Sequence, residues 1–510
     1  MKMAKLFTKI MRDVPGGRVH MYALLCAAIA ATGSMARADW TQYRFDPAHH
    51  GVNPNETILS PATVGNLTVK WHVSVGGGGD ASATAADGRV YVVRERANDN
   101  EGGGKLYALD RNTGQELWNF PPDALAGDFS TTTPAVANGI VYFGVNRGGP
   151  VVYAVNATTG VRIWSHGGPI AQIISSPTVL DGRVYVAFTD GTIRALDAAT
   201  GQVIWSAVQD QGAYSSPAVA GGRLYIAIHN RGLLALDAAT GATLWLSPIP
   251  GPQWSSPAVD NGRVFVGSRD DHKVYAFDAV TGQTLWTATT SDWVHSSPAV
   301  ANGVVYIGNE AGDLHAFNAA TGGLIWRTGL TNTGIFNGPT VANGVVYAAG
   351  EDAKLYAVEA ATGRVLFRGS IDNAGQSLAS PTVDGGTVYI PAYDQSAVTA
   401  FALDTPPPTP TPTATATPTP QPSATPTPGQ ITLSAVGYKV HGVNTVDLSW
   451  NGATSSQVDI YRDGVVRVRT ANDGFHTDST GSRGQATHRY KVCEAGTLTC
   501  SNEVTVKFGR

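Results

Sequence analysis

Residues Ser296–Trp326, which read SSPAVANGVVYIGNEAGDLHAFNAATGGLIW, contain one copy of a repeat that runs through most of the chain. Its framework is S-S-P-x-V, then an apolar V-Y strand, then A-x-D-A-x-T-G-x-x-x-W. The glycine of the Thr-Gly pair recurs at positions 114, 160, 201, 241, 282, 322 and 363, at intervals of 40 to 46 residues. A repeat of ~40–45 residues with several short strands per unit is typical of a β-propeller, not of a helical solenoid.

Each copy alternates short apolar strands with tight turns. The pairs Asn302-Gly303 and Asp181-Gly182 favour the positive φ that a two-residue hairpin needs. A carboxylate or amide stands just before each Thr-Gly turn, where it can accept backbone N–H bonds. Its identity varies between aspartate, asparagine and glutamate, so we expect it to stabilise the turn and not to catalyse: Asp197, Asp237, Asp278, Asn156, Asn318 and Glu359.

The closing aromatics predict the number of blades. Seven copies end in an aromatic residue, and Trp71 in NLTVKW is an eighth that has no strands ahead of it. Residues 379–404 hold three strands and lack a closing one. We therefore predict an all-β, eight-bladed propeller over residues 39–404, in which the N-terminal strand completes the last four-stranded blade. Such closure removes exposed sheet edges.

The N-terminal residues 1–38 are typical of a signal peptide. A basic start is followed by an apolar run at 21–32, too short to span a membrane, and by the small residues Ala36 and Ala38. We predict cleavage before Asp39 and export to the periplasm, the cell surface or the medium. Cys26 then leaves with the signal peptide.

Residues 405–430 are rich in proline and threonine and predict an extended, semi-rigid linker. Residues 431–510 show alternating strand patterns and resemble a fibronectin type III or related immunoglobulin-like β-sandwich. The resemblance implies core positions for Trp450 and Tyr490. Export permits a disulfide between Cys493 and Cys500, and a zinc site is disfavoured because the neighbouring residues offer no set of four ligands.

The repeats over residues 39–404 resemble those of the pyrroloquinoline-quinone-like (PQQ-like) propellers, and DWTQYRFDPAHHGVNP (39–54) is similar to the segment that begins such proteins. The family contains periplasmic dehydrogenases, which bind the quinone with calcium on the propeller axis. It also contains binding scaffolds without a cofactor, such as the lipoprotein of the outer-membrane barrel-assembly machine. The resemblance implies the fold, and the function must be argued from a site.

Two marks that many of the family's enzymes carry are missing. The mature propeller has no cysteine, so it has no disulfide between adjacent cysteines, and no CxxCH haem motif occurs. We therefore expect a secreted, non-enzymatic binding or scaffold protein, monomeric and without cofactor, whose propeller face binds a protein, peptide or polysaccharide. The alternative is a quinoprotein oxidoreductase, a PQQ- and calcium-dependent alcohol or sugar dehydrogenase. The net charge of −4 and the lack of a basic stripe argue against a nucleic-acid partner.

One column varies when the copies are aligned on their Ser-Pro step. Four successive copies place aromatic rings there, namely Tyr214, Trp254, His295 and Phe336, and the others place Thr131, Ile174 and Leu378. We expect this aromatic arc at one mouth of the central channel, where it either binds a ligand or merely plugs the channel. The loops between the second and third strands should reach the same face: 94–104, 229–232, 268–272 and 308–313.

The other candidate sites in the sequence are supported by weaker patterns. Asp270, Asp271 and His272, and the pair His49-His50, lack the oxygen-rich spacing of a calcium loop. No G-x-S-x-G, H-E-x-x-H or phosphate-loop motif occurs. A glycosidase with two facing carboxylates is conceivable on a propeller. The sequence, however, does not show that any two of Asp128, Glu310 and Glu351 lie close enough to form such a pair. The sequence thus assigns no catalytic, cofactor-binding or metal-ligating residue.

Overall fold

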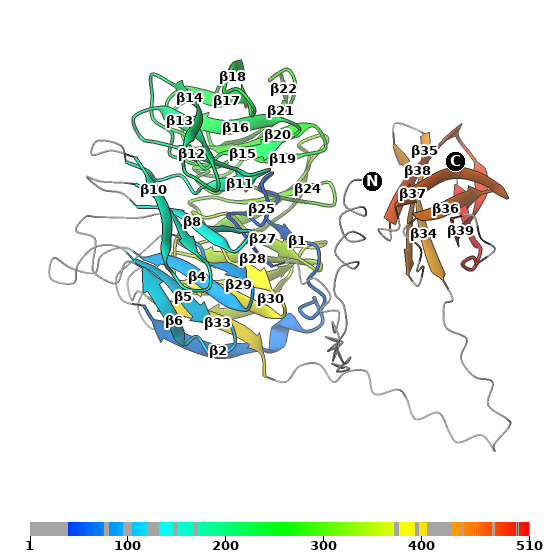
Figure 1. Cartoon of the computed structure of the whole chain (residues 1–510), viewed down its shortest axis with the longest axis horizontal. Coiled ribbons are helices and arrows are strands. Elements are labelled where there is room, and N and C mark those ends of the chain that lie inside the picture. The colour runs from blue at the N-terminus through cyan, green and yellow to red at the C-terminus, as the bar shows by residue number, and fades with distance from the viewer. Residues whose placement is uncertain are drawn as a thin grey trace, which may run out of the picture. The chain divides into compact units, whose positions relative to one another are not determined.

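The computed structural model describes residues 39–75, 81–94, 105–120, 132–145, 151–167, 172–371, 377–392, 397–404, 431–440 and 443–508, with short gaps at 452, 454, 456, 472–474, 496 and 498. Its contacts divide the chain into two compact units, residues 1–410 and 411–510 (Figure 1). The predicted signal peptide, the linker at 405–430, Thr131, Asp128 and loop residues 95–104 lie outside the described residues.

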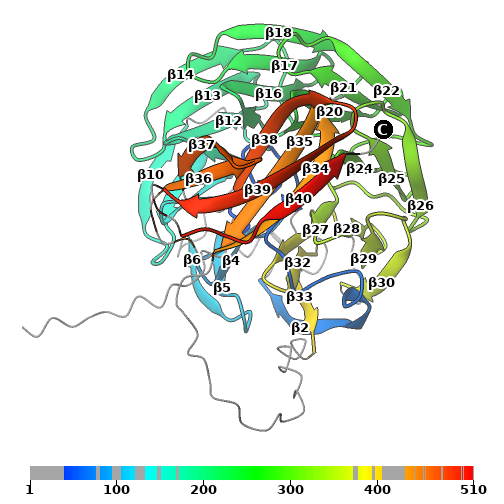
Figure 2. The ribbon, with the colours of Figure 1, turned by 90° about the vertical axis from the view of Figure 1, so that its right-hand side faces the viewer.

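The strands of the first unit form four-stranded antiparallel sheets around a central axis, with β14, β18, β22 and β26 on the outer rim (Figure 2). The described residues make eight such sheets, and a short strand β1 (Val52–Asn53) adds to one of them in parallel. From the axis outward the sheets are β3 (Thr84–Ala86), β4 (Arg89–Arg94), β5 (Lys105–Asp110), β6 (Glu116–Phe120); β7 (Ala135–Ala137), β8 (Ile140–Gly144), β9 (Val152–Asn156), β10 (Arg162–His166); β11 (Thr178–Leu180), β12 (Arg183–Ala187), β13 (Thr192–Asp197), β14 (Val203–Val208); β15 (Ala218–Ala220), β16 (Arg223–Ile228), β17 (Gly232–Asp237), β18 (Thr243–Pro248); β19 (Ala258–Asp260), β20 (Arg263–Ser268), β21 (Lys273–Asp278), β22 (Thr284–Thr289); β23 (Ala299–Ala301), β24 (Val304–Gly308), β25 (Asp313–Asn318), β26 (Leu324–Gly329); β27 (Thr340–Ala342), β28 (Val345–Gly350), β29 (Lys354–Glu359), β30 (Val365–Ser370); and β31 (Thr382–Asp384), β32 (Thr387–Pro391), β33 (Ala397–Leu403), β2 (Leu67–Ser74).

The first long strand closes the ring. A 3₁₀ turn, η1 (Val64–Asn66), leads into β2, which pairs antiparallel with β33 from Leu67 opposite Leu403 to Ser74 opposite Ala397. The start of the chain therefore completes the sheet that its last repeat begins. The prediction of an all-β propeller is confirmed.

The repeated Thr-Gly and Trp residues form the contact between neighbouring sheets. Gly241 has φ +75°, and a Cβ atom there would lie 2.5 Å from the ring of Trp205 in the preceding sheet. Trp205 Nε1 donates to the carbonyl of Ala238, and Asp237 Oδ1 accepts from the backbone and hydroxyl of Thr240. The glycine-on-tryptophan contact recurs in the pairs Gly114–Trp71, Gly160–Trp118, Gly201–Trp164, Gly282–Trp245, Gly322–Trp286 and Gly363–Trp326. The repeat is thus a packing device, and its carboxylate stabilises the turn.

Residues 40–53, which we call the inner belt, run around the inside of the ring. The belt bonds to each innermost strand in turn, because its carbonyl and amide groups meet the unpaired edge of that strand. These bonds are 2.6–3.0 Å long: Ala85 N–Trp40 O, Val136 N–Thr41 O, Val179 N–Gln42 Oε1, Val219 N–Pro47 O, Val259 N–Ala48 O, Val300 N–His50 O, Val341 N–Gly51 O and Asn53 Nδ2–Val383 O. The belt therefore ties all eight sheets together.

Buried side chains anchor the inner belt. Arg44 is fully buried and donates from Nη2 to the carbonyl of Pro298 at 2.8 Å. His50 lies 3.7 Å from Asp260 and 2.6 Å from Asp46, and these carboxylates raise its pKa to about 10. His49 is buried beside the Pro257 carbonyl, and burial lowers its pKa to about 3. Both histidines of the His49-His50 pair therefore have structural contacts.

The second unit is built of two sheets. One has the order β34 (Thr432–Val440), β35 (Val443–Asn451), β38 (Phe475–Arg483), and the other β37 (Val465–Ala471), β36 (Gln457–Arg462), β39 (Ala486–Glu494), β40 (Val504–Phe508). Trp450 and Tyr490 are buried in its core, and Cys493 and Cys500 form the predicted disulfide. The fibronectin type III assignment stays a prediction. No helix in the described residues has the length and apolar character needed to cross a membrane.

Candidate functional site

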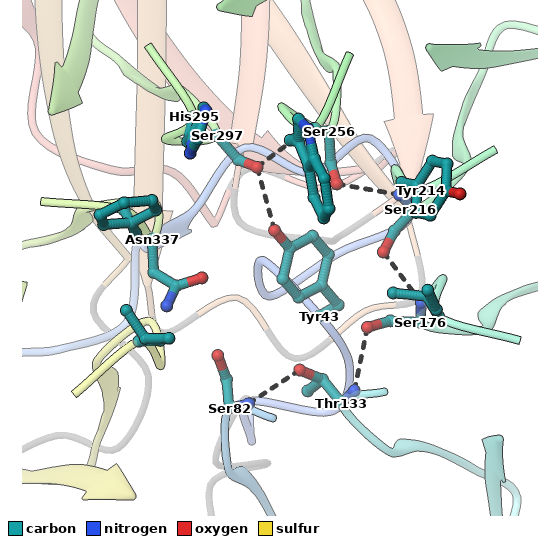
Figure 3. Close-up of a pocket in the computed structure, with 14 residues that line it drawn as sticks. Tyr43, Ser82, Thr133, Ser176, Tyr214, Ser216, Ser256, His295, Ser297 and Asn337 are labelled. Carbon is teal, nitrogen blue, oxygen red and sulfur yellow. Dashed lines mark hydrogen bonds between the residues drawn. The ribbon is translucent and has the colours of Figure 1, made fainter. Parts of the chain in front are cut away.

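A pocket of about 320 Å³ lies on the propeller axis (Figure 3). All eight sheets contribute to it through the segment that precedes their innermost strand, and the inner belt contributes Tyr43. The lining residues are Tyr43, Ser82, Thr133, Ile174, Ser176, Tyr214, Ser216, Trp254, Ser256, His295, Ser297, Phe336, Asn337 and Leu378. A volume of this size is at the lower end of the ~300–1,000 Å³ range of small-molecule sites.

The four rings predicted from the varying column form one continuous wall of this pocket. Ring centroids are 5.0 Å apart for Tyr214 and Trp254, 6.1 Å for Trp254 and His295, and 4.9 Å for His295 and Phe336. Trp254 is 44% exposed, which is high for so large an apolar side chain. The structure therefore brings the aromatic arc together beside an open cavity, with aliphatic Ile174 and Leu378 elsewhere in the lining.

A ring of hydroxyl groups surrounds the same cavity, and sequence reasoning missed it. The second residue of the Ser-Ser-Pro step accepts, through its side-chain oxygen, the backbone N–H of the same step in the neighbouring sheet. Six such bonds of 2.9–3.1 Å connect Ser380, Ser82, Thr133, Ser176, Ser216, Ser256 and Ser297 in that order. Figure 3 shows the part of this series from Ser82 to Ser297. Because the oxygens act as acceptors, the O–H groups that line the pocket remain available as donors. We call the six pocket-lining members, Ser82 to Ser297, the hydroxyl ring.

The ring is interrupted at one sheet, where Gly338 replaces the serine. A Cβ atom at Gly338 would lie 2.3 Å from Arg44, so the arginine of the inner belt occupies the place of the missing side chain. The neighbouring Tyr43 stands in the middle of the pocket residues and donates its hydroxyl to Ser297 Oγ at 3.1 Å (Figure 3). The inner belt thus contributes an aromatic side chain to the lining and fills the gap in the ring.

Charged and polar loop residues stand beside the aromatic arc, as predicted for the loops between second and third strands. The His229 ring is 4.7 Å from that of Tyr214, and the Arg269 guanidinium lies 4.0 Å from the Trp293 ring centre. Glu310 Oε1 lies 3.2 Å from His295 Nδ1. Burial lowers the pKa of His295 to about 4, with a further contribution from Arg269. Burial, and then the nearby Asp292, raises the pKa of Glu310.

The acidic cluster of the same loops has other partners. Asp271 accepts the hydroxyl of Tyr275 and lies 3.3 Å from Lys273 Nζ. Within the parts of the chain that the structure describes, no three His, Cys, Asp or Glu side chains are grouped so that they could hold a metal ion.

Comparisons with known proteins agree with the fold. The family model of the outer membrane protein assembly factor BamB matches residues 62–253, 211–333 and 310–406. The quinohemoprotein alcohol dehydrogenase of Comamonas testosteroni is 34% identical over 98 residues, 17% of this chain and 13% of that protein. The polyvinylalcohol dehydrogenase of Pseudomonas sp is 27% identical over 195 residues, 34% of this chain and 28% of that protein. The solved quinohemoprotein alcohol dehydrogenase of Pseudomonas putida HK5 is similar with a TM-score of 0.60 at 17% identity, over 77% of this chain and 83% of that one.

These findings correct two expectations, that of a non-enzymatic scaffold and that of no cofactor. The similar proteins include dehydrogenases, two of them named as quinohemoproteins. The expectations relied on missing adjacent cysteines and a missing haem motif. A planar cofactor can be held by ring faces and hydrogen bonds alone, so the absence of those marks does not exclude one. The alignments span only 13% and 28% of the first two enzymes. The similarity to the solved structure, at 17% identity, shows a shared fold and nothing more.

Proposed function

The chain belongs to the BamB family of propellers with PQQ-like repeats, and from that premise we propose that it is an oxidoreductase that uses pyrroloquinoline quinone to oxidise alcohols. The observation that carries the proposal is the aromatic arc. It forms a wall of four rings on a pocket at the propeller axis, and Trp254 offers an exposed indole face. Planar ring systems bind by stacking on such faces.

The residues of the pocket fit this cofactor in shape and in hydrogen bonding. Pyrroloquinoline quinone is planar and carries carboxylates and quinone carbonyls at its edges. The aromatic arc suits its faces, and the O–H groups of the hydroxyl ring suit its oxygen-rich edges. Arg269, beside His295, adds a positive charge that favours a bound carboxylate. The pocket thus combines an aromatic wall with hydroxyl donors and a small aliphatic patch.

The proposal assigns no metal ligands. The described residues contain no group of three His, Cys, Asp or Glu side chains arranged to hold an ion. A bound calcium ion would have to draw its oxygen ligands from groups other than such a cluster, for example hydroxyls, carbonyls or the cofactor itself.

When bound, the quinone supplies a two-electron acceptor for the substrate's carbon-bound hydrogen. The protein's own groups position the reactants around it. Trp254 orients a planar ring by stacking, and the hydroxyl ring fixes its edges. Ile174 and Leu378 give the lining an apolar patch that suits the carbon chain of an alcohol. The predicted signal peptide supports export, and monomeric assembly is part of the same proposal.

A titration of the full chain tests the proposal. Tryptophan fluorescence is followed while pyrroloquinoline quinone is added, with and without calcium, and dye-linked oxidation of primary alcohols and polyvinyl alcohol is assayed in parallel. We expect saturable quenching at micromolar quinone together with turnover. Pyridine-2,6-dicarboxylate, a planar dicarboxylate without a quinone, controls for non-specific anion binding. Linear, non-saturating quenching equal to that control would contradict the proposal.

A further inference from the structure

A second cavity in the propeller, of about 430 Å³, shares no lining residue with the axial pocket. It is formed by residues that follow β26 in one sheet and by β29, β30 and the turn before β29 in the next sheet. The lining residues are Leu330, Thr331, Asn332, Asp352, Lys354, Tyr356, Arg368 and Ser370. All of them except Leu330 carry a polar group in the side chain, so the cavity suits a polar ligand.

The only carboxylate of this lining is already paired with a cation. Asp352 Oδ2 accepts hydrogen bonds from Lys354 Nζ at 2.9 Å and from the Tyr356 hydroxyl at 2.6 Å. The Asp352 and Lys354 charges compensate each other at this distance. The net charge of the cavity is therefore set by its one remaining ionised residue.

That residue is Arg368, on the outer strand β30. It lies opposite Tyr356 in the antiparallel pairing, with its guanidinium carbon 5.9 Å from the Tyr356 ring centre. Its side chain is exposed, and the neighbouring Glu359 forms its ion pair with Arg364 instead. A guanidinium is planar and always charged, and it can donate two parallel hydrogen bonds to one carboxylate. The cavity thus offers a cation to an anionic ligand, although Asp and Glu outnumber Lys and Arg in residues 39–404.

A second sheet repeats the acidic, lysine and tyrosine residues of this cavity and shows what distinguishes it. Asp271 lies 3.3 Å from Lys273 Nζ and accepts the hydroxyl of Tyr275. The residue opposite Tyr275 in the outer strand of that sheet is Thr287, in the position that Arg368 has opposite its own tyrosine. The shared group of three residues is therefore a local packing arrangement. The arginine is the feature that this cavity adds to it.

Uncharged polar groups accompany the arginine. Ser370 lies two residues beyond Arg368 on the same face of the sheet, opposite Lys354. Thr331 and Asn332, which follow β26 of the neighbouring sheet, also line the cavity, and Asn332 and Ser370 are exposed. Hydroxyl and amide groups both donate and accept hydrogen bonds, so they suit a ligand with hydroxyl groups of its own.

From this arrangement we propose that the cavity is a second binding site and that its ligand is a sugar acid, a carboxylate that also carries several hydroxyl groups. Arg368 binds the carboxylate, and Thr331, Asn332 and Ser370 form hydrogen bonds with the hydroxyls. A free uronate and a uronate unit of an acidic polysaccharide present the same groups to such a site. The inference does not rest on the proposed function, because it involves neither the quinone nor the axial pocket.

Isothermal titration calorimetry of the full chain, without quinone and at low ionic strength, tests the inference. The ligands are D-galacturonate, polygalacturonate, D-galactose, which lacks the carboxylate, and acetate, which lacks the hydroxyls. We expect saturable binding of galacturonate, and binding of galactose and acetate that is weaker by about tenfold or more. Tighter binding of the polymer per uronate unit would identify the polysaccharide as the ligand, and equal affinity would identify the free sugar acid.

Three variants locate the site on the chain. Arg368→Gln should weaken galacturonate binding about 10- to 100-fold, because charge-assisted hydrogen bonds are lost. Arg368→Lys keeps the charge but loses the planar fork, so its affinity should lie between those of Arg368→Gln and the wild type. Arg364→Gln is the matched control, because it removes the same charge just before β30 and outside the cavity, and it should bind as the wild type does. Both arginines are exposed, so urea unfolding should show the stability of the wild type in all three.

Several outcomes would overturn the inference. Galactose or acetate that binds as tightly as galacturonate would show that the site does not recognise a sugar acid. Unchanged binding by Arg368→Gln, or equal weakening in Arg364→Gln, would remove the cavity from the account, as would no saturable binding of either uronate ligand. Dye-linked alcohol oxidation by Arg368→Gln should equal that of the wild type, so the proposed function and this site are tested by separate measurements.

Discussion

The contact between neighbouring sheets and the mouth of the channel use the same repeat in opposite ways. Between the sheets, a glycine packs on the tryptophan of the preceding repeat in every copy from Gly114 to Gly363. At the mouth, the residue before the Ser-Ser-Pro step changes from sheet to sheet: Ile174, then Tyr214, Trp254 and His295. Residues that repeat build the ring, and residues that differ form a site with one aromatic side.

The two regions also differ in solvent exposure. Trp205, Trp286 and Trp326 of the inter-sheet contact are no more than 9% exposed, whereas Trp254 at the mouth is 44% exposed. Burial of an indole between two sheets stabilises the folded propeller. An exposed indole beside a cavity contributes no such burial until a ligand covers it. The same residue type therefore serves stability in one region and, we propose, binding in the other.

The largest effect should come from breaking the repeated contact. In Gly241→Ala the new methyl group would lie 2.5 Å from Trp205, at φ +75°, so we expect a loss of about 2–4 kcal/mol in the free energy of unfolding. The control is Gly262→Ala, which has φ +73° and no atom within 4 Å. Urea unfolding of both variants isolates the tryptophan contact. Equal losses would show that backbone strain alone explains this glycine.

A smaller effect should come from the varying residue at the mouth. Trp254→Ala should weaken quinone binding about 10- to 100-fold, equivalent to about 1.4–2.8 kcal/mol, because a stacking face is lost. The free energy of unfolding should stay within about 0.5 kcal/mol of the wild type, since the side chain is exposed. Leu244→Ala on the outer rim, 45% exposed, is the control and should leave binding unchanged. A Trp254→Ala protein that binds the quinone as tightly as the wild type would remove the aromatic arc from the account.

The smallest effect should come from the inner belt, and it should depend on pH. Asp260 and Asp46 raise the pKa of His50 to about 10 in the folded protein, against about 6.5 when unfolded. The protonated ring therefore stabilises the fold fully below pH 6.5, and this contribution is lost as pH rises through 10. We expect His50→Asn to cost about 1–2 kcal/mol at pH 6, since the pair is partly exposed, and to approach the wild type above pH 10. Unfolding curves at several pH values measure this, and a difference that is constant with pH would contradict it.

The propeller and its aromatic arc could be predicted because both follow from comparing the copies of the repeat within one sequence. The spacing of the Thr-Gly glycines indicated the propeller, and the column that contains Trp254 and His295 indicated the wall. The hydroxyl ring was equally visible, since Ser176, Ser216 and Ser256 repeat. It was missed because the repeated serine before proline served only as the framework on which the copies were aligned.

Other features could not be predicted from repetition. The inner belt precedes the repeats and has no period, so nothing in the sequence indicated that Arg44 would lie beside Gly338. The pairing of His295 with Glu310 joins two loops of one sheet, and spacing does not determine loop conformation to within hydrogen-bond distance. The function was predicted wrongly for a related reason. The prediction relied on the absence of cysteines, which provide only one kind of contact with a cofactor. The pocket instead offers aromatic ring faces and hydroxyl groups.

A crystal structure of the full chain grown with pyrroloquinoline quinone tests the central claim most directly. We predict planar density in the axial pocket, stacked on Trp254, with its carboxylates within hydrogen-bond distance of the hydroxyl ring. Density for the quinone at any other place, or an axial pocket filled only by water at saturating quinone, would contradict the account.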